Sequence, residues 1–152
     1  MLRDIDTPPL WLALALVAGW ALGRVWPGPG LGWTGLGWPG LLVIVAGLVL
    51  MSLALLAMGR ARTTFIPRRD PTALVTGGVF GLSRNPIYLA DAMILTGALL
   101  YWGAWAGLPL VPLFMVLITR RFIRDEEARL HAGFAAAYEA WAARVPRWFW
   151  RI

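Results

Sequence analysis

The sequence predicts an all-α integral membrane protein, in which four transmembrane helices are followed by an amphipathic helix on the cytoplasmic side. Three observations predict this fold class. Of the 152 residues, 59% are hydrophobic and only 14% are charged, whereas soluble domains are roughly half apolar and one-quarter charged. The apolar residues form runs long enough to cross a hydrocarbon core of about 30 Å. The basic residues cluster between and after these runs. We therefore expect a single membrane domain over residues 1–152.

Four apolar segments are predicted to be the membrane spans, and they cover residues of about 10–26, 40–59, 86–102 and 104–123. Backbone groups in lipid must be hydrogen-bonded within their own segment, so we expect these spans to be helices. Proline suits the first turn of a helix, and Pro8, Pro9 and Pro86 stand where the first and third helices should begin. Pro109 and Pro112 are expected to bend the fourth helix.

The arginines predict the orientation of the chain in the membrane. All fourteen basic residues are arginines, and only Arg24 lies between the first two spans. Arg3 precedes the first span, and the others lie in the second loop or after the fourth span: Arg60, Arg62, Arg68, Arg69, Arg84, Arg120, Arg121, Arg124, Arg129, Arg144, Arg147 and Arg151. Because basic residues are enriched in cytoplasmic loops, we expect both termini and the second loop to face the cytoplasm, with the chain in the cytoplasmic membrane. The first apolar run lacks a small-residue cleavage site, so it is expected to be a retained span.

The composition also argues against several kinds of site. The net charge of +6 follows from the membrane topology, so it does not indicate a nucleic-acid partner. Cysteine is absent and His131 is the only histidine, so we expect no metal site. The Gly- and Trp-rich segment 27–39 is expected to be an interfacial loop. Its Gly30–Gly35 stretch fits a dinucleotide-binding pattern, but no acidic residue follows about twenty residues later.

After the fourth span, residues of about 124–144 are predicted to form an amphipathic helix. Its apolar residues recur at spacings of three and four, and they are Leu130, Phe134, Tyr138 and Trp141. Two arrangements are open for this helix. It either lies on the headgroup surface or packs over the cytoplasmic mouth of the bundle.

Ionisable residues at both ends of the last two spans are the strongest functional signal. The segment Arg84–Tyr88 (RNPIY) opens the third span, and Glu126 and Glu127 follow the fourth. If the third helix begins near Asn85, Tyr88 and Asp91 lie three residues apart on one face, and Asp91 lies within the membrane. Acids at that depth are costly and mark function. The alternative is a structural one, in which these acids form ion pairs with nearby arginines.

Several motifs in order resemble one known family. They are LVTGGVF at residues 74–80, RNPIY at 84–88, the pair Glu126-Glu127, the residues Leu130, Phe134 and Tyr138, and VPR at 145–147. In this order and spacing they resemble the integral-membrane methyltransferases, which include isoprenylcysteine carboxyl methyltransferases and phospholipid N-methyltransferases. The resemblance covers residues of about 57–149. The chain departs from the family pattern by Asn85 for histidine, Ala135 for glycine and Trp141 for tyrosine.

The resemblance implies an S-adenosylmethionine site, with S-adenosylhomocysteine as the product. It implies that the cofactor-binding residues are Leu74, Val75, Phe80, Arg84, Asn85, Pro86, Tyr88, Glu126 and Glu127. Arg84 suits the cofactor carboxylate, and Glu126 or Glu127 suits its ammonium or ribose. The Leu74-Val75 backbone, Phe80 and Tyr88 suit the adenosine. Asn85 can hydrogen-bond but does not titrate near neutral pH, so we expect a binding role there rather than proton transfer.

The acceptor is expected to be a lipophilic molecule or lipid that arrives from the bilayer. Its reacting group stays open between a carboxylate, a thiol and an amine, and no catalytic residue is fixed. An anionic acceptor could be oriented by an arginine, for which the candidates are Arg120, Arg121 and Arg124. An amine must lose a proton, and Asp91 or a glutamate is then the candidate base. The alternative function is a non-enzymatic small membrane protein that binds anionic lipid or a partner.

Overall fold

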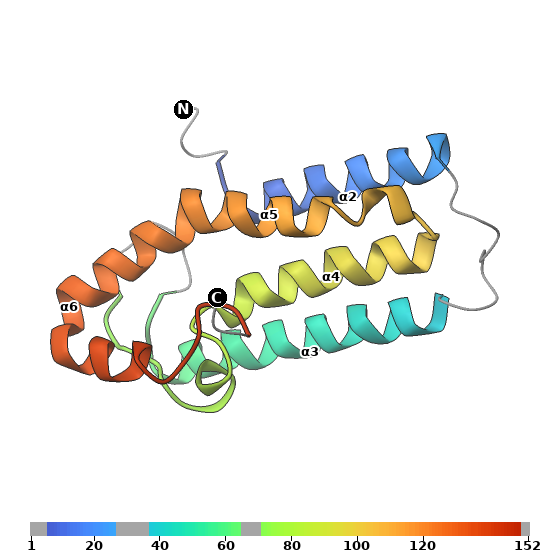
Figure 1. Cartoon of the computed structure of the whole chain (residues 1–152). Helices are drawn as coiled ribbons and strands as arrows, with labels where there is room; N and C mark the ends of the chain where they lie inside the picture. Colours follow the sequence, from blue (N-terminus) through green and yellow to red (C-terminus); the bar gives the residue numbers. More distant parts are fainter. Residues whose placement is uncertain (1–5, 27–36, 65–70, 150–152) are drawn as a thin grey trace.

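The computed structural model describes residues 6–26, 37–64 and 71–149, and every regular element among them is helical. In chain order the elements are α2 (Pro8–Val25), α3 (Gly37–Arg60), η1 (Gly78–Gly81), α4 (Pro86–Trp102), η2 (Trp105–Gly107), α5 (Leu110–Ile118), η3 (Thr119–Ile123) and α6 (Arg124–Ala142). Figure 1 shows α2, α3, α4 and α5 side by side as a bundle, while α6 extends beyond one end. The predicted all-α class is confirmed.

Three helical stretches are long and apolar enough to cross a membrane: Pro8–Val25, Gly37–Arg60 and Trp105–Ala142, the last of which comprises η2, α5, η3 and α6. The predicted span 86–102 forms α4 with those bounds, but it is a shorter apolar helix of 17 residues. The predicted interfacial loop 27–39 lies outside the described residues over 27–36. Its last three residues already belong to α3, which begins at Gly37.

Proline and glycine residues mark the two ends of α4 and the start of α5. Asn85 is the N-cap of α4 and Pro86 its first residue, while Gly103 ends the helix in a left-handed conformation with φ 66°. The predicted span 104–123 is interrupted where Pro109 stands, because η2 ends at Gly107 and α5 begins only at Leu110. Pro109 is the N-cap of α5 and Pro112 lies in its first turn, where the N–H that proline lacks has no partner within the helix.

Helices α3 and α4 approach so closely that their backbones touch. A Cβ atom on Gly40 would lie 2.7 Å from the Gly97 carbonyl oxygen, and one on Gly97 would lie 2.6 Å from the Gly40 carbonyl oxygen. Gly47 meets the carbonyl of Ala90 in the same way, at 3.0 Å. Small residues permit this contact, which is a main source of helix association in lipid. Helix α3 thereby fixes one side of α4.

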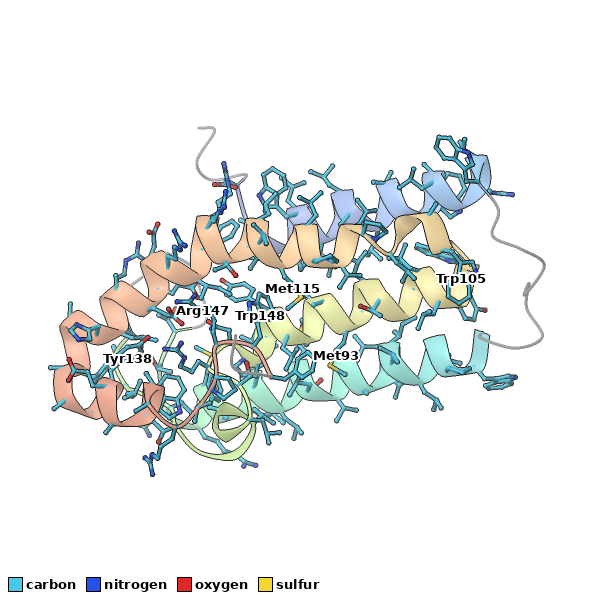
Figure 2. All side chains as sticks on the ribbon, viewed as in Figure 1. Met93, Trp105, Met115, Tyr138, Arg147 and Trp148 are labelled. Atoms are coloured by element: carbon cyan, nitrogen blue, oxygen red, sulfur yellow. The ribbon has the colours of Figure 1, made fainter. Side chains whose placement is uncertain are left out.

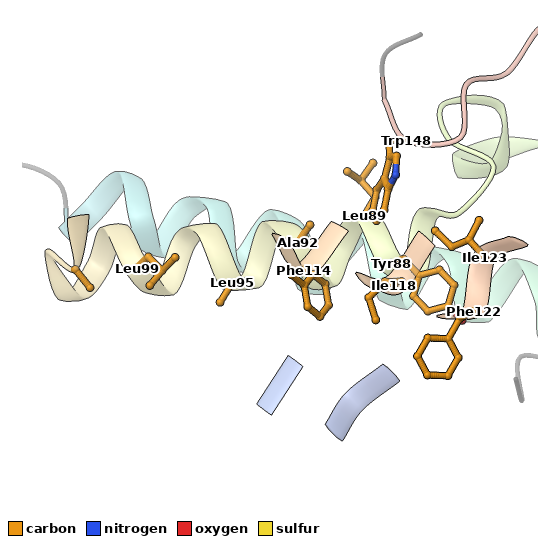
Figure 3. Packing of buried hydrophobic residues seen from close by; sticks show 11 residues of the cluster. Tyr88, Leu89, Ala92, Leu95, Leu99, Phe114, Ile118, Phe122, Ile123 and Trp148 are labelled. Carbon is orange, nitrogen blue, oxygen red and sulfur yellow. The ribbon is translucent and has the colours of Figure 1, made fainter. Parts of the chain in front are cut away.

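The opposite side of α4 packs on α5 and the turn that follows it. Leu95 and Leu99 of α4 are fully buried, as are Ile118 of α5 and Phe122 of η3. Figure 3 shows this cluster along α4, with Trp148 of the C-terminal segment packed beside Leu89. The start of α4 is therefore enclosed by residues that are distant in the sequence.

Helix α6 covers most of the predicted range of about 124–144, but its backbone is not helical throughout. Ala135 has φ 35° and ψ −111°, which breaks the helix, and Figure 1 shows the chain folding back there. The second half then packs over the end of the bundle, where Tyr138 and Trp141 are buried in a cluster with Phe80 and Val145. Of the two arrangements left open, the structure has the one that covers the bundle.

Gly97→Ala should destabilise the bundle by about 1 to 3 kcal/mol, because the added methyl meets the α3 backbone and neither helix can yield. The measurement is the free energy of unfolding in mixed detergent micelles. Gly59→Ala is the matched control, since no atom lies within 4 Å of a Cβ there. Equal effects of the two substitutions would contradict the close approach.

Ala135→Gly should stabilise the protein by about 1 kcal/mol, because glycine adopts a positive φ without the steric cost that a Cβ imposes. Ala136→Gly, one residue further on, should instead destabilise it by about 0.5 to 1 kcal/mol. The free energy of unfolding of both variants tests the kink, because the two substitutions should change it in opposite directions. A loss of stability in both would mean that residue 135 lies in regular helix.

Candidate functional site

The C-terminal segment folds back onto the start of α4 and fixes it by backbone contacts. The Arg84 N–H donates to the Pro146 carbonyl at 2.9 Å. The Ser83 hydroxyl and the Asn85 side-chain amide both donate to the Arg147 carbonyl at 3.1 Å. Asn85 therefore holds a segment of its own chain, 62 residues away.

Glu127 lies at the centre of a charged cluster that joins three segments. Arg147 donates from Nε to both of its carboxylate oxygens, at 3.0 and 3.2 Å, and from Nη2 at 2.5 Å. Arg84 approaches the same carboxylate at 3.5 Å and donates from Nη1 to the Tyr138 hydroxyl at 3.1 Å. The hydrogen bonds to Glu127 raise the pKa of Arg147. Figure 2 shows Tyr138 and Arg147 at the end of the bundle that α6 covers.

Glu126 points to a different partner from its neighbour. The Tyr88 hydroxyl donates to its Oε1 atom at 2.6 Å, which links α6 to the first turn of α4. Adjacent residues on a helix point about 100° apart, which explains the divergence. Burial raises the pKa of the Glu126 carboxyl, and the hydrogen bond from Tyr88 opposes that rise.

A pocket of about 60 Å³ adjoins the charged cluster. It is lined by Met58, Thr63, Pro71, Ala73, Leu74, Val75, Phe80, Arg84, Leu130 and Trp141. The indole of Trp141 donates to the Phe80 carbonyl at 3.0 Å and so fixes one wall. The Arg84 Nε atom is buried without a hydrogen-bond partner. An arginine donor in an apolar wall suits an anionic group.

The structure brings most of the predicted cofactor residues to one end of the bundle, in two groups. Leu74, Val75, Phe80 and Arg84 line the pocket. Tyr88 belongs to the core cluster along α4 and α5, whereas Phe80 belongs to the cluster under α6. Phe80 and Tyr88 therefore do not form one wall. The two groups meet at the charged cluster, since Arg84 contacts Glu127.

A comparison with models of protein families shows to which family the chain is related. A model of the phospholipid methyltransferase family matches residues 37–137, which is more than half of the chain. The chain belongs to this family. No curated protein and no solved structure matches it. Family membership implies a membrane methyltransferase.

The family match covers some residues of the site and ends before others. It includes the segment Arg84–Tyr88 and both glutamates, whereas Tyr138 and Arg147 lie beyond residue 137. Sequence reasoning did not assign Arg147 as a site residue, although the VPR motif contains it. Tyr138 and Trp141 were assigned to an apolar stripe and to the family motif, but not to the cofactor site. The signal that could have identified Tyr138 is its hydroxyl group, which a lipid-facing stripe does not need.

The four candidates for catalysis lie in two different environments. Arg120, Arg121 and Arg124 are exposed, and Arg121 forms an ion pair with Asp6 at 2.8 Å. None of the three contacts the charged cluster among the described residues. Asp91 is buried inside the bundle. In the part of the chain that the structure describes, no group of three or more possible ligands is arranged for a metal ion.

Arg147→Gln should lower the free energy of unfolding of this phospholipid methyltransferase family member by about 1 to 3 kcal/mol, because it removes charge-assisted hydrogen bonds to a largely buried carboxylate. Hydrogen exchange of the Arg84 amide should also increase, since its acceptor is next to Arg147. Arg144→Gln is the control: Arg144 is exposed, follows the end of α6, and its Nε donates to the Ala140 carbonyl of that helix. Unchanged exchange at Arg84 would show that Arg147 does not hold the segment.

Proposed function

We propose that this member of the phospholipid methyltransferase family is an S-adenosylmethionine-dependent methyltransferase that acts on a lipophilic acceptor delivered by the bilayer. The observation that carries the proposal is the pocket beside a buried charged cluster at one end of the bundle. In this proposal residues 1–152 form one membrane domain, with α2, α3, α4 and the α5–η3 region as four spans. Helix α4 has 17 residues, the lower limit for a span.

The orientation that we propose follows from the arginines. The end of the bundle with Arg84, Arg120 and Arg147 would face the cytoplasm, and Arg24 would lie at the opposite face. The charged cluster then lies on the side where a water-soluble cofactor is available. The acceptor would reach the same end from between the helices.

The chemistry of the residues fits the cofactor. The unpartnered Arg84 Nε would bind its carboxylate, and Leu74, Val75 and Phe80 would enclose its adenosine. Both oxygens of Glu127 already accept hydrogen bonds from Arg147, whereas among the described residues only the Oε1 atom of Glu126 accepts one, from Tyr88. Glu126 is therefore the carboxylate that we assign to the ammonium or the ribose. When bound, the cofactor supplies a methyl group on a positively charged sulfur.

The site must open before a cofactor can bind. A pocket of about 60 Å³ is far below the roughly 300–1,000 Å³ of small-molecule sites. The contact between Arg147 and Glu127 is partly solvent-accessible, since the Arg147 side chain is 37% exposed. Release of the C-terminal segment at this contact would widen the pocket, and its return would exclude water from the site.

Catalysis in this proposal relies on position rather than on a protein nucleophile. Methyl transfer is an in-line displacement, and holding the acceptor atom about 3 Å from the methyl carbon can supply most of the rate enhancement. The close α3–α4 contact keeps α4 fixed, so Tyr88 and Glu126 hold their places. Exclusion of water by the C-terminal segment strengthens the electrostatic interactions at the site.

The test is binding of S-adenosylhomocysteine to the detergent-solubilised protein, measured by calorimetry. Saturable binding is expected, and Arg84→Gln and Glu126→Gln should each weaken it at least about tenfold, the effect of losing a charge-assisted hydrogen bond. Arg24→Gln at the opposite end of the bundle is the control and should bind like the wild type. Absence of saturable binding to the wild type would refute the proposal.

A further inference from the structure

The end of the bundle away from α6 carries a second pocket, which the proposed methyl transfer does not use. It has a volume of about 200 Å³ and is lined by Trp20, Gly23, Arg24, Tyr101 and Trp102. These residues come from the end of α2 and the end of α4, and Figure 1 shows both helices ending on this side of the molecule. Trp20, Arg24 and Trp102 are exposed, so the pocket opens on the outer surface of the bundle.

Close backbone packing fixes the walls of this second pocket. A Cβ atom on Gly23 of α2 would lie 2.7 Å from the Cβ atom of Ala104. One on Gly40 of α3 would lie 2.6 Å from the backbone nitrogen of Tyr101. The helix ends are therefore held with little freedom to move, and a ligand meets a site that is already formed, which lowers the cost of binding.

Arg24 brings to this end of the bundle a charge that no acid of the chain balances. The sequence has no charged residue other than Arg24 between Asp6 and Arg60, and none between Asp91 and Arg120. The helix ends around the pocket belong to these two stretches. Arg24 forms no hydrogen bond or ion pair with any residue that the structure describes. Its counterion must therefore come from outside the chain.

The guanidinium of Arg24 is held by an aromatic ring and still presents its donors. Its central carbon lies 5.2 Å from the centroid of the Trp20 ring. Stacking of this kind uses the flat face of the guanidinium and leaves the N–H groups at its edge available for an anion. The indole N–H groups of Trp20 and Trp102 also have no acceptor among the described residues. The pocket thus combines one fixed cation with further N–H donors.

A stripe of exposed side chains leads away from the pocket along α2. It consists of Trp20, Val17, Leu14 and Leu10, each of them at least 36% exposed. Residues at spacings of three and four share one face of a helix, and Arg24 continues this face four residues after Trp20. A lipid whose headgroup is bound at Arg24 would lay an acyl chain along this stripe.

We infer that this second pocket binds the phosphate of an anionic phospholipid, which stays bound as part of the structure and is not the methyl acceptor. Tryptophan and tyrosine prefer the headgroup region of a bilayer, so the pocket lies at the depth of the lipid phosphates. The fork of an arginine fits two phosphate oxygens. A headgroup that also carries an ammonium would place a second cation beside Arg24, so an anionic lipid is favoured.

The inference does not depend on the proposed methyltransferase function. The pocket lies at the other end of the bundle from Arg84, and none of its residues is assigned to the cofactor. Failure of the cofactor-binding test therefore leaves this lipid site standing. Failure of the lipid test likewise leaves the proposed function standing.

The first test counts lipids bound to the detergent-solubilised protein by native mass spectrometry, with phosphatidylglycerol and phosphatidylethanolamine of the same acyl chains. The wild type should bind one phosphatidylglycerol at least about tenfold more tightly than phosphatidylethanolamine. Arg24→Gln should weaken this one site at least about tenfold, the effect of losing a charge-assisted hydrogen bond. Arg60→Gln is the matched control, since Arg60 is also exposed in the last turn of an apolar helix, at the other end of the bundle. Equal losses in the two variants, or no loss in Arg24→Gln, would overturn the inference.

A second test separates a formed site from simple attraction between charges, and a lipid from free phosphate. Arg24→Lys keeps the charge but lacks the planar fork, so it should still weaken phosphatidylglycerol binding severalfold. Full retention of the lipid by Arg24→Lys would overturn the pocket. Excess inorganic phosphate, or the water-soluble headgroup without acyl chains, should not displace the lipid, because neither can lie along α2. Displacement by either would overturn the assignment to a lipid.

Discussion

The carboxylate of Glu127 joins three segments at one point: α6, the segment before α4 and the C-terminal segment. It is 12% exposed, so each hydrogen bond to it acts in a medium less polar than water. Arg147 and Arg84 come from segments with no regular structure of their own, and their positions depend on this charge. An ion pair of this kind contributes little net stability when it replaces good apolar packing. Such a pair instead favours one arrangement of the segments, because any arrangement that separates the partners leaves a buried charge unpaired.

The glycine contact between α3 and α4 provides the rigid part on which that cluster is built. Since the two backbones touch at Gly40 and Gly97, α4 cannot shift without breaking the contact. Its other side is free to carry the core residues and, near its start, Tyr88 and Asp91. The molecule thus combines a fixed pair of helices with a charged end whose contacts reach the solvent.

The hydrophobic runs predicted the helices well because length and apolarity are local properties. The bounds of α4 agree with the prediction, since Asn85, Pro86 and Gly103 encode its ends directly. The fold-back at Ala135 could not be predicted, because alanine favours a helix and only the packing of Tyr138 and Trp141 offsets the cost. The order of motifs indicated which residues gather at one end. It did not indicate that Asn85 and Glu127 bind the C-terminal segment, because such pairings depend on tertiary distances.

The contact of the C-terminal segment with the start of α4 also affects the order of folding. Contacts between Arg84 and Pro146 close a loop of more than sixty residues, and such long-range closures form slowly and late in folding. Helix pairing between neighbours such as α3 and α4 needs no comparable closure. The bundle can therefore pack in the bilayer while its charged end is still open. By the same reasoning, that end should be the first part of the molecule to unfold locally.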